Sequence, residues 1–271
     1  MTDQSDDVVQ SVDSQASLER AVSGTFVQST EFHSSLPSTN DRGMALAKLT
    51  LSDDSHTELP TLILAAEQTA GRGRKGDVWL SPTGNLAFSL LLDIHELGFT
   101  RQDQARLSLI MAVAVCGAAR RAVGDNRIVC KWPNDVLAGD RKIAGILVET
   151  TGSNRMVIGV GINVNSRQED FSPEILATSL YHLKQAPVDA VSLLRESLGD
   201  FAQIAREVAG SSDLLPKFWR EVDGFVDLMV GIRIAGANAT GRVVGINRDG
   251  HLQLLTAEGA KSFPDGTIRL N

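Results

Sequence analysis

The sequence predicts an α+β fold, with a mixed, mostly antiparallel sheet flanked by helices and a small β-barrel at the C-terminal end. Between residues 101 and 123, apolar residues recur every three or four positions, which is the spacing of one helix face. Three β-branched runs, at 127–131, 142–149 and 155–164, are separated by Gly, Asp and Asn turns and predict consecutive strands. After Asp223, short alternating runs predict about four or five strands of a small barrel.

Composition bounds the size and number of domains. The chain has 271 residues, of which 42% are hydrophobic and 22% are charged, so it can bury a sizeable core. We predict a flexible acidic tail at 1–20, a main domain at 21–222 and the barrel domain at 223–271. Residues 1–20 are rich in aspartate and other polar side chains, which argues against a packed element there.

Charge and hydropathy exclude several classes of protein. The net charge is -7 and the sequence pI is about 5.3, so nothing global favours nucleic acid as a partner. The N-terminus has no signal-peptide pattern and the chain has no run of about eighteen apolar residues, which predicts a cytoplasmic protein without a membrane anchor. Cys116 and Cys130 lie in apolar surroundings without metal-ligand spacing, and we expect two buried, reduced thiols.

The remaining elements follow from periodicity and from helix-capping residues. Residues 26–33 have strand character, and the polar residues at 36–41, among them Ser38 and Thr39, offer N-caps for a short helix at 44–49. Apolar runs predict strands at 61–66 and 86–92, two more stretches predict helices around 187–208 and 213–221, and the barrel strands are expected at 229–234, 241–247, 251–256 and 267–270.

The segment 67–76 is the most informative part of the chain, because three glycines and three cations alternate directly after an apolar strand. Glycine lets the backbone approach a ligand closely, and guanidinium groups bind phosphate or carboxylate oxygens in bidentate fashion. The segment therefore predicts an anion-binding loop, although a solvated basic surface loop has the same composition. Its GxGxxG spacing also fits a dinucleotide-binding turn with Asp93 as the ribose acid, but a strand rather than a helix follows the glycines.

A second informative segment is Lys131-Trp-Pro-Asn-Asp135, which ends a predicted strand in a rigid turn. It brings together a cation, an amide and a carboxylate, and by itself it is also explained as a turn in which Asn and Asp cap neighbouring amides. Gly145, Gly159 and Gly161 lie on adjacent predicted strands, where glycine often marks a close backbone approach. These glycines indicate either a ligand slot beside the sheet or core packing without a ligand.

Taken together, the motifs resemble those of biotin protein ligases, in the order found in that family and from Phe26 to the C-terminus. Each motif is weak alone, whereas six in one order are specific. One position departs from the pattern, because Asp77 stands where the family commonly has a third arginine, which would weaken the positive charge of the loop. The motifs are Pro37-Ser-Thr-Asn40, Glu67-Gln-Thr-Ala-Gly-Arg-Gly-Arg74, Trp79 with Ser81-Pro82, Lys131-Trp-Pro-Asn-Asp135, Arg141-Lys-Ile-Ala-Gly-Ile-Leu-Val-Glu149 and Gly159-Val-Gly-Ile-Asn163.

The resemblance implies the catalytic fold shared by biotin and lipoate ligases, an SH3-like C-terminal barrel and a two-step reaction. Biotin's carboxylate would attack the α-phosphate of MgATP to give biotinyl-5'-AMP and pyrophosphate. A lysine of a biotin carboxyl carrier protein domain, the part of a carboxylase that carries biotin, would then take the biotinyl group. ATP and Mg2+ would be co-substrates and biotin the substrate, with the metal bound mainly through ATP and no tightly bound prosthetic group. We expect no DNA or membrane partner, and a homodimer is left open.

The family's motifs also imply roles for individual residues. The catalytic group would consist of Lys142, Asp135, Arg72, Arg74 and Lys131, in which the cations neutralise the reacting anions and Asp135 holds or deprotonates the acceptor lysine. Biotin would contact Ser38, Thr39, Asn40, Gln68, Gly71, Arg72, Gly73, Arg74, Lys142, Gly145, Gly159, Gly161 and Ile162. The nucleotide would contact Trp79, Lys131, Asn134, Lys142, Asn163 and Arg269.

The sequence leaves alternative functions to consider. A lipoate-protein ligase or octanoyltransferase of the same fold is the nearest alternative, and the paired glycine-arginine and Lys-Trp-Pro-Asn-Asp motifs argue against it. A DNA-binding repressor needs an N-terminal DNA-reading head, for which too little chain precedes the predicted core. A pure binding module or an NAD enzyme is disfavoured because a strand follows the glycine-rich turn.

Overall fold

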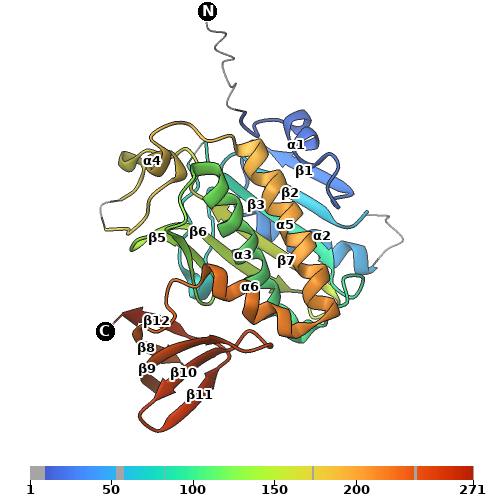
Figure 1. The fold of residues 1–271 in the computed structure, drawn as a ribbon. Coiled ribbons are helices and arrows are strands. Elements are labelled where there is room, and N and C mark those ends of the chain that lie inside the picture. The colour runs from blue at the N-terminus through green and yellow to red at the C-terminus, as the bar shows by residue number, and fades with distance from the viewer. Residues whose placement is uncertain (1–9, 53–57, 83, 173, 235–236, 271) are drawn as a thin grey trace, which may run out of the picture.

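The computed structural model describes residues 10–52, 58–82, 84–172, 174–234 and 237–270. Its larger sheet has seven strands: β1 (Ser29–His33), β2 (Thr61–Ala65), β3 (Leu86–Asp93), β4 (Ile128–Lys131), β5 (Asp135–Ala138), β6 (Arg141–Thr150) and β7 (Arg155–Ile162). The strand order is β1-β2-β3-β7-β6-β5-β4 (Figure 1). Only the β1–β2 pair is parallel among these neighbours, so the predicted mixed, mostly antiparallel sheet is confirmed.

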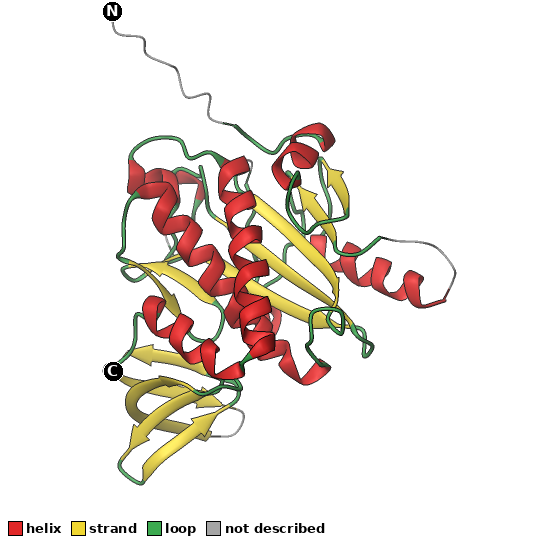
Figure 2. Cartoon of the chain, turned by 45° about the vertical axis from the view of Figure 1, so that its right-hand side comes forward, coloured by secondary structure: helices red, strands yellow, loops and turns green. Residues whose placement is uncertain are grey.

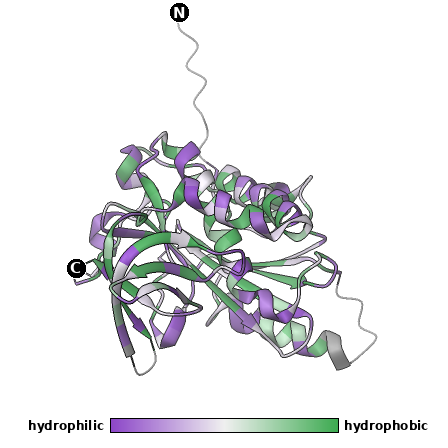
Figure 3. Cartoon of the chain, turned by 60° about the horizontal axis from the view of Figure 1, so that its bottom comes forward, coloured by the Kyte–Doolittle hydropathy of each residue, from purple (hydrophilic) through white to green (hydrophobic). Residues whose placement is uncertain are grey.

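The centre of this sheet is covered on both faces. Every residue of β2 and nearly every residue of β3 and β7 is buried, so these strands are continuous apolar runs instead of alternating ones. β4, at one edge, alternates buried and half-buried residues. Figure 3 shows the same contrast, with largely hydrophobic strands in the sheet and helices that carry both hydrophobic and hydrophilic residues.

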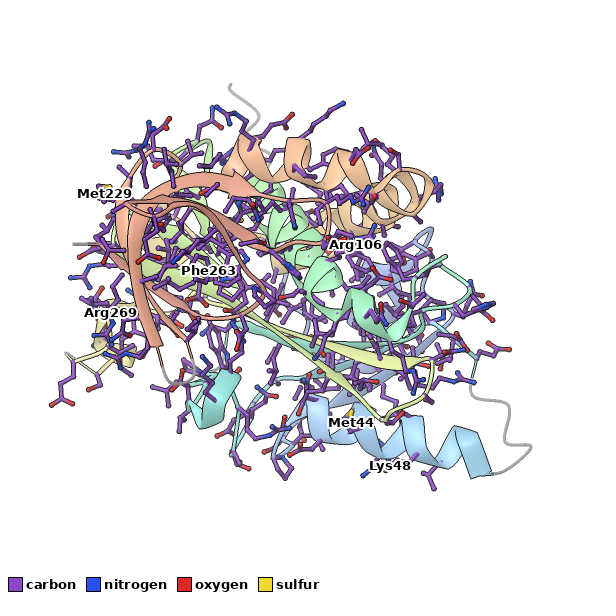
Figure 4. The ribbon with its side chains drawn as sticks, turned by 90° about the horizontal axis from the view of Figure 1, so that it is seen from below. Met44, Lys48, Arg106, Met229, Phe263 and Arg269 are labelled. Carbon is purple, nitrogen blue, oxygen red and sulfur yellow. The ribbon has the colours of Figure 1, made fainter. Side chains whose placement is uncertain are left out.

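Six α-helices accompany the strands in the described residues: α1 (Gln15–Val22), α2 (Thr39–Ser52), α3 (Gln104–Val123), α4 (Leu180–Lys184), α5 (Ala190–Gly210) and α6 (Leu215–Val222). The long helices α3 and α5 pack side by side across one face of the sheet (Figure 2). α2, with Met44 and Lys48, packs on the opposite face against β3 and β7 (Figure 4). None of the helices in the described ranges has the length and apolar character needed to cross a bilayer.

A second, antiparallel sheet follows α6 and confirms the small C-terminal β-unit. Its strands are β8 (Met229–Ile234), β9 (Ala237–Ile246), β10 (Leu252–Thr256), β11 (Gly259–Phe263) and β12 (Thr267–Leu270), in the order β11-β10-β9-β8-β12. The sheet curves strongly, as Figure 4 shows. Its inner side is buried, and Val230, Ile232, Val243 and Leu254 are among the residues there.

The prediction of a flexible tail at 1–20 is wrong for the described part of that segment. A capping box closes the N-terminus of α1, and the helix packs against β1 and α5. Leu18 and Ala21 are fully buried, and Arg195 of α5 donates a hydrogen bond to the carbonyl oxygen of Ala21 at 3.2 Å. The aspartates dominated the composition and hid two apolar positions three residues apart, which is enough to bury one helix face. Residues 1–9 lie outside the described part of the chain.

The other predicted elements are present with shifted ends. α2 is longer than the predicted helix at 44–49 and begins at Thr39, so Thr39 is its first residue and not its cap. The hydroxyl of Ser38 accepts a hydrogen bond of 3.5 Å from the backbone N–H of Asp41. α4 was not predicted, because five residues are too few to show a helical period. The division into a main domain and a barrel domain at 222/223 stays a prediction.

Candidate active site

A cavity lies where the two sheets meet, and seven separate parts of the chain contribute to its wall. They are residues 38–40 at the start of α2, Gln68, residues in 72–79, the turn between β4 and β5, β6, β7, and the start of β12. The wall includes fifteen of the predicted site residues: Ser38, Thr39, Asn40, Gln68, Arg72, Gly73, Arg74, Trp79, Lys131, Asn134, Asp135, Lys142, Gly145, Gly159 and Gly161. The fold therefore brings together motifs that are far apart in the sequence.

Residues 71–79 form a short hairpin, which we call the arginine hairpin. The carbonyl of Gly71 accepts a hydrogen bond of 2.9 Å from the N–H of Trp79, which closes the base. A single 3-10 turn, Arg74–Gly76, forms the tip. Lys75 has a φ of 56° there, in the left-handed region that a side chain makes unfavourable. The backbone of the tip is thus held in a conformation that needs support from its surroundings.

Two of the cavity's cations are paired with carboxylates of the larger sheet and of α2. The guanidinium of Arg72 lies 2.6 Å from Asp41 Oδ1 and 3.1 Å from Glu149 Oε2. The hydrogen bond to Asp41 raises the pKa of Arg72, so its charge is fixed. The ammonium of Lys142 lies 2.6 Å from Asp135 Oδ1. Both pairs orient a positive charge at the cavity wall.

Arg74 and Lys131, which also line the cavity, are held in different ways. Arg74 donates to Asn134 Oδ1 at 3.3 Å and forms an ion pair with Asp265 of the turn between β11 and β12. Lys131 has its ammonium 5.9 Å from the centre of the Phe225 ring. Burial lowers the pKa of Lys131; the charge of Asp135 opposes this, but burial together with the positive charges of Lys142 and Arg269 outweighs it. Its ammonium is therefore poorly solvated, which favours contact with an anion.

A buried polar network forms one side of the cavity. Ser38, Thr39 and Asn40 are all less than 5% exposed. Gln68 Oε1 accepts hydrogen bonds from the Thr39 backbone N–H at 2.8 Å and from its hydroxyl at 3.1 Å. The Ser89 hydroxyl lies 2.6 Å from Asn40 Oδ1 and 2.8 Å from the Thr39 hydroxyl, and its single proton is donated to one of the two. These bonds fix the orientation of polar groups that could bind a neutral polar ligand.

The glycines of β6 and β7 face the cavity and are needed there. Gly145 and Gly161 are register partners, and Gly159 lies two residues before Gly161 on the same face. A Cβ on Gly161 would lie 2.2 Å from the indole of Trp79, and one on Gly159 would lie 2.0 Å from Asn40 Oδ1. The structure thus favours close approach to the sheet by Trp79 and Asn40 over simple core packing.

Four predicted contact residues are not part of the cavity wall. Gly71 closes the base of the arginine hairpin, and Ile162 is fully buried in the core. Asn163 is also buried and donates to the carbonyl of Thr178 at 3.1 Å, so its amide braces the chain beneath the site. Arg269 is exposed on β12, at the outer edge of the C-terminal sheet in Figure 4, and acts on Lys131 only through its charge. The contacts predicted for these four residues stay predictions.

Sequence reasoning missed three acidic partners, and from the C-terminal sheet it named Arg269 but not the residues that line the cavity. Asp41 and Asp265 carry no recognisable motif, and Glu149 ended one of the motifs without being given a role. Gly266, Thr267 and Ile268 also line the cavity, although nothing in their sequence distinguishes them from other strand residues. Long-range pairing of this kind is set by the tertiary fold.

The chain is similar in sequence to a known protein family and to several of its members. The model of the biotin/lipoate A/B protein ligase family matches residues 34–165. The bifunctional ligase/repressor BirA of Bacillus subtilis is 31% identical over 217 residues, which cover 78% of this chain and 66% of that relative's length. The biotin--[acetyl-CoA-carboxylase] ligase of Mycobacterium tuberculosis is 37% identical over 161 residues, covering 57% of this chain and 59% of that protein.

The solved structures show the same similarity in three dimensions. The biotin protein ligase from Aquifex aeolicus, in complex with biotin and ATP, is 26% identical and has a TM-score of 0.78, covering 90% of this chain and all of that one. The sequence matches, the fold and the residues that line the cavity therefore agree on one family. The chain belongs to the biotin/lipoate A/B protein ligase family.

Proposed function

We propose that the protein is an ATP-dependent biotin protein ligase, which forms biotinyl-5'-AMP and transfers biotin to a lysine of a biotin carboxyl carrier protein domain. One observation carries the proposal: five cations from three separate segments line a single cavity, beside a buried polar network and a glycine-lined strand pair. The cations are Arg72, Arg74, Lys75, Lys131 and Lys142. The Aquifex aeolicus structure, which contains biotin and ATP, supports the same pair of substrates.

The first step joins two anions, and the cations make this feasible. The carboxylate oxygen of biotin attacks the α-phosphorus of ATP, and the bond to the bridging oxygen of pyrophosphate breaks. Charge repulsion between carboxylate and phosphate opposes this approach, so fixed positive groups lower the barrier. Each charge-assisted hydrogen bond contributes about 1.5–3 kcal/mol. No nucleophile of the protein is needed.

The polar network and the strand glycines suit the two ends of biotin. Its ureido ring offers neutral donors and an acceptor, which Ser38, Thr39 and Gln68 can satisfy from buried, already oriented groups. Its apolar part can lie beside the indole of Trp79, which packs against Gly161 at the cavity wall. Small-molecule sites commonly combine an apolar wall with a few fixed polar groups in this way.

The second step needs a neutral amine. Deprotonating a lysine of pKa about 10.4 at a pH near 7.4 costs about 4 kcal/mol. Asp135 lines the cavity and already binds an ammonium, that of Lys142, at 2.6 Å. It is our candidate to hold the acceptor lysine and receive its proton while the amine attacks the acyl carbon and AMP leaves.

Magnesium is proposed to enter with ATP. Among the residues that the structure describes, no group of three or more His, Cys, Asp or Glu side chains is placed to hold a metal ion. Mg2+ is commonly bound by one or two carboxylates together with the phosphates of the nucleotide. The phosphates would therefore supply most of its ligands.

Mass spectrometry after incubation with MgATP and either biotin or lipoate tests the proposal. Biotin should give a complex heavier by one biotinyl-AMP, and pyrophosphate should exchange into ATP only when biotin is present. Lipoate serves as the matched alternative substrate, because lipoate ligases share the fold. An adenylate formed with lipoate and not with biotin would contradict the proposal, as would the absence of both.

A further inference from the structure

We infer that Asp265, in the turn between β11 and β12, is a positioning residue that holds the tip of the arginine hairpin on the cavity wall. The inference rests on the proposed function. It assigns to the C-terminal sheet the task of keeping Arg74 in place between biotin activation and transfer. No motif of the sequence marks Asp265.

The contacts of Asp265 come from the hairpin tip on one side and from its own turn on the other. Its Oδ1 accepts a hydrogen bond from Arg74 Nη2, and its Oδ2 lies 3.9 Å from the ammonium of Lys75. Partial burial would raise the pKa of Asp265, but the hydrogen bonds from Arg74 and from the N–H of Gly266 outweigh it and lower the pKa. The carboxylate is thus ionised and shared by two neighbouring cations of the hairpin.

The pairing leaves Arg74 available to a ligand. A guanidinium has five N–H donors in a fixed plane. The structure shows bonds from Arg74 to only two acceptors among the described residues, Asn134 and Asp265, while its side chain lines the cavity. Asp265 therefore orients the guanidinium and leaves some of its N–H donors available to a ligand. Orientation before binding removes part of the entropy cost of forming the new contacts.

The position of the pair also bears on water access. A second cavity lies beside the first, between the start of α3 and the turns of the C-terminal sheet. Arg74 lines both cavities, and Asp265 lines the second. The pair thus lies on the wall that separates them. An acyl phosphate is lost to water or to solution if that wall opens, so a loose tip should shorten its life on the enzyme.

The hairpin has other attachments, which makes the contribution of Asp265 separable. Arg72, nearer the base, is held by Asp41 and Glu149 on the larger sheet and its helix. Asp265 is the partner supplied by the C-terminal sheet. Lys75 has left-handed backbone, which a free tip would relax. Removing the carboxylate should therefore free the tip and leave the base attached.

The test compares Asp265→Asn with Glu258→Gln. Glu258 is also an exposed carboxylate in a turn of the C-terminal sheet, but its cation is Lys261 of the same hairpin. Limited trypsin digestion of the ligand-free protein, read by mass spectrometry, reports cleavage after Arg74 and Lys75 relative to cleavage after Arg72. Release of biotinyl-AMP from the loaded enzyme is measured in parallel, and melting temperatures check that the variants are folded.

We expect Asp265→Asn to raise relative cleavage at the tip and the rate of adenylate release by about two- to fivefold each, the range for loss of partly exposed ion pairs. Asp265→Glu, which keeps the charge, should restore most of both values, and Glu258→Gln should match the wild type. Unchanged cleavage in Asp265→Asn would overturn the inference, as would faster cleavage with unchanged or slower adenylate release. If the wild type forms no adenylate, the proposed function fails, and the cleavage ratio by itself still decides whether Asp265 holds the tip.

Discussion

At the residue scale, the cavity joins cations to acidic neighbours. Arg72 is bound by Asp41 and Glu149, and Lys142 is bound by Asp135. Such pairs orient a cation, but removing the cation leaves its carboxylate unpaired at the cavity. Truncation of one of these side chains should therefore do two kinds of damage: it removes a contact to the substrate anion and exposes that anion to a negative charge.

Lys142 provides the clearest case of this double effect. Lys142→Ala should lower biotin-dependent exchange of pyrophosphate into ATP by at least the about 10- to 100-fold expected for one lost charge-assisted hydrogen bond. Adding Asp135→Asn should recover part of the loss, because the unpaired carboxylate is then neutral. Lys261→Ala, at a lysine paired with Glu258 on the C-terminal sheet, is the control. Undiminished exchange in Lys142→Ala would remove Lys142 from the catalytic group.

The lowered pKa of Lys131 predicts that ATP affinity depends on pH, and that Lys131→Arg abolishes this dependence. Burial lowers its pKa below the ordinary 10.5, so the folded protein loses this proton at a lower pH than the unfolded chain does. ATP affinity should fall as pH rises through the lowered pKa, whereas Lys131→Arg, whose charge does not titrate there, should keep it. Titration calorimetry with MgATP between about pH 7 and 10 measures this difference.

The same shift fixes the sign of a stability effect at Lys131. Between the lowered pKa and 10.5 the unfolded chain binds more protons, so the free energy of unfolding should rise with pH in that window. Lys131→Arg should lack this rise. Parallel pH profiles for the wild type and the variant, in affinity as well as in stability, would contradict the assignment.

The sequence identifies these cations and Asp135, but not the other acidic partners, for a physical reason. Chemistry-bearing residues lie in short local motifs whose residue types are restricted by the ligand. Their acidic partners need only a carboxylate in reach, and the fold can supply it from any segment. Arg72 and Glu149 are 77 residues apart, and Arg74 and Asp265 are 191 residues apart. No local pattern could reveal such a pair.

At the element scale, periodicity predicted the elements that bury a long apolar stripe. α3 was recognised because buried residues recur along most of its twenty residues. α1 was missed because it has eight residues and a polar composition, and its burial depends on α5, which lies far along the chain. The turn-then-strand interpretation of the glycine-rich segment is confirmed, since β3 follows it and not a helix. It was decisive in setting aside a dinucleotide fold.

The arginine hairpin is the element in which this chain differs from the family pattern. Asp77 is exposed and lines the cavity near the other charges of the hairpin. A negative charge there weakens the attraction of the hairpin for the adenylate's phosphate. Asp77→Arg should therefore lengthen the half-life of biotinyl-AMP on the enzyme, measured by its release into a trap of unlabelled substrate.

Glu258→Arg makes the same change in charge on the C-terminal sheet and controls for net charge. About a two- to tenfold effect is expected for Asp77→Arg, given a partly screened contact at the surface. Equal half-lives in Asp77→Arg and the wild type would show that the third cation of the pattern is dispensable in this hairpin.

At the scale of the whole molecule, the site exists because two sheets meet. Residues of the β12 segment complete a cavity otherwise built on the larger sheet. Backbone contacts join the two parts. Cys130 and Asp223 form an isolated parallel β-bridge, and the carbonyl of Cys130 accepts a hydrogen bond of 3.1 Å from the N–H of Gly224. The indole N–H of Trp132 also donates to the carbonyl of Gly250 at 3.0 Å. Anything that loosens this junction should disturb the cavity without touching its cations.

Trp132→Phe tests this coupling, because it removes the hydrogen bond to Gly250 and leaves the ring's apolar packing largely in place. Ser197→Ala is the control: Ser197 is as deeply buried, and its hydroxyl donates to the carbonyl of Leu193 within its own helix, α5. Each variant should lose about 1–4 kcal/mol of the free energy of unfolding, from an unpaired polar group and a small cavity. Only Trp132→Phe should also weaken ATP binding, by about three- to tenfold, because the β12 wall is no longer fixed against the Lys131 turn.

Denaturant unfolding and titration with MgATP measure the two effects separately. If both variants bound ATP equally well at equal loss of stability, the junction would be a matter of folding alone, and the contribution of β12 to the cavity would not depend on it.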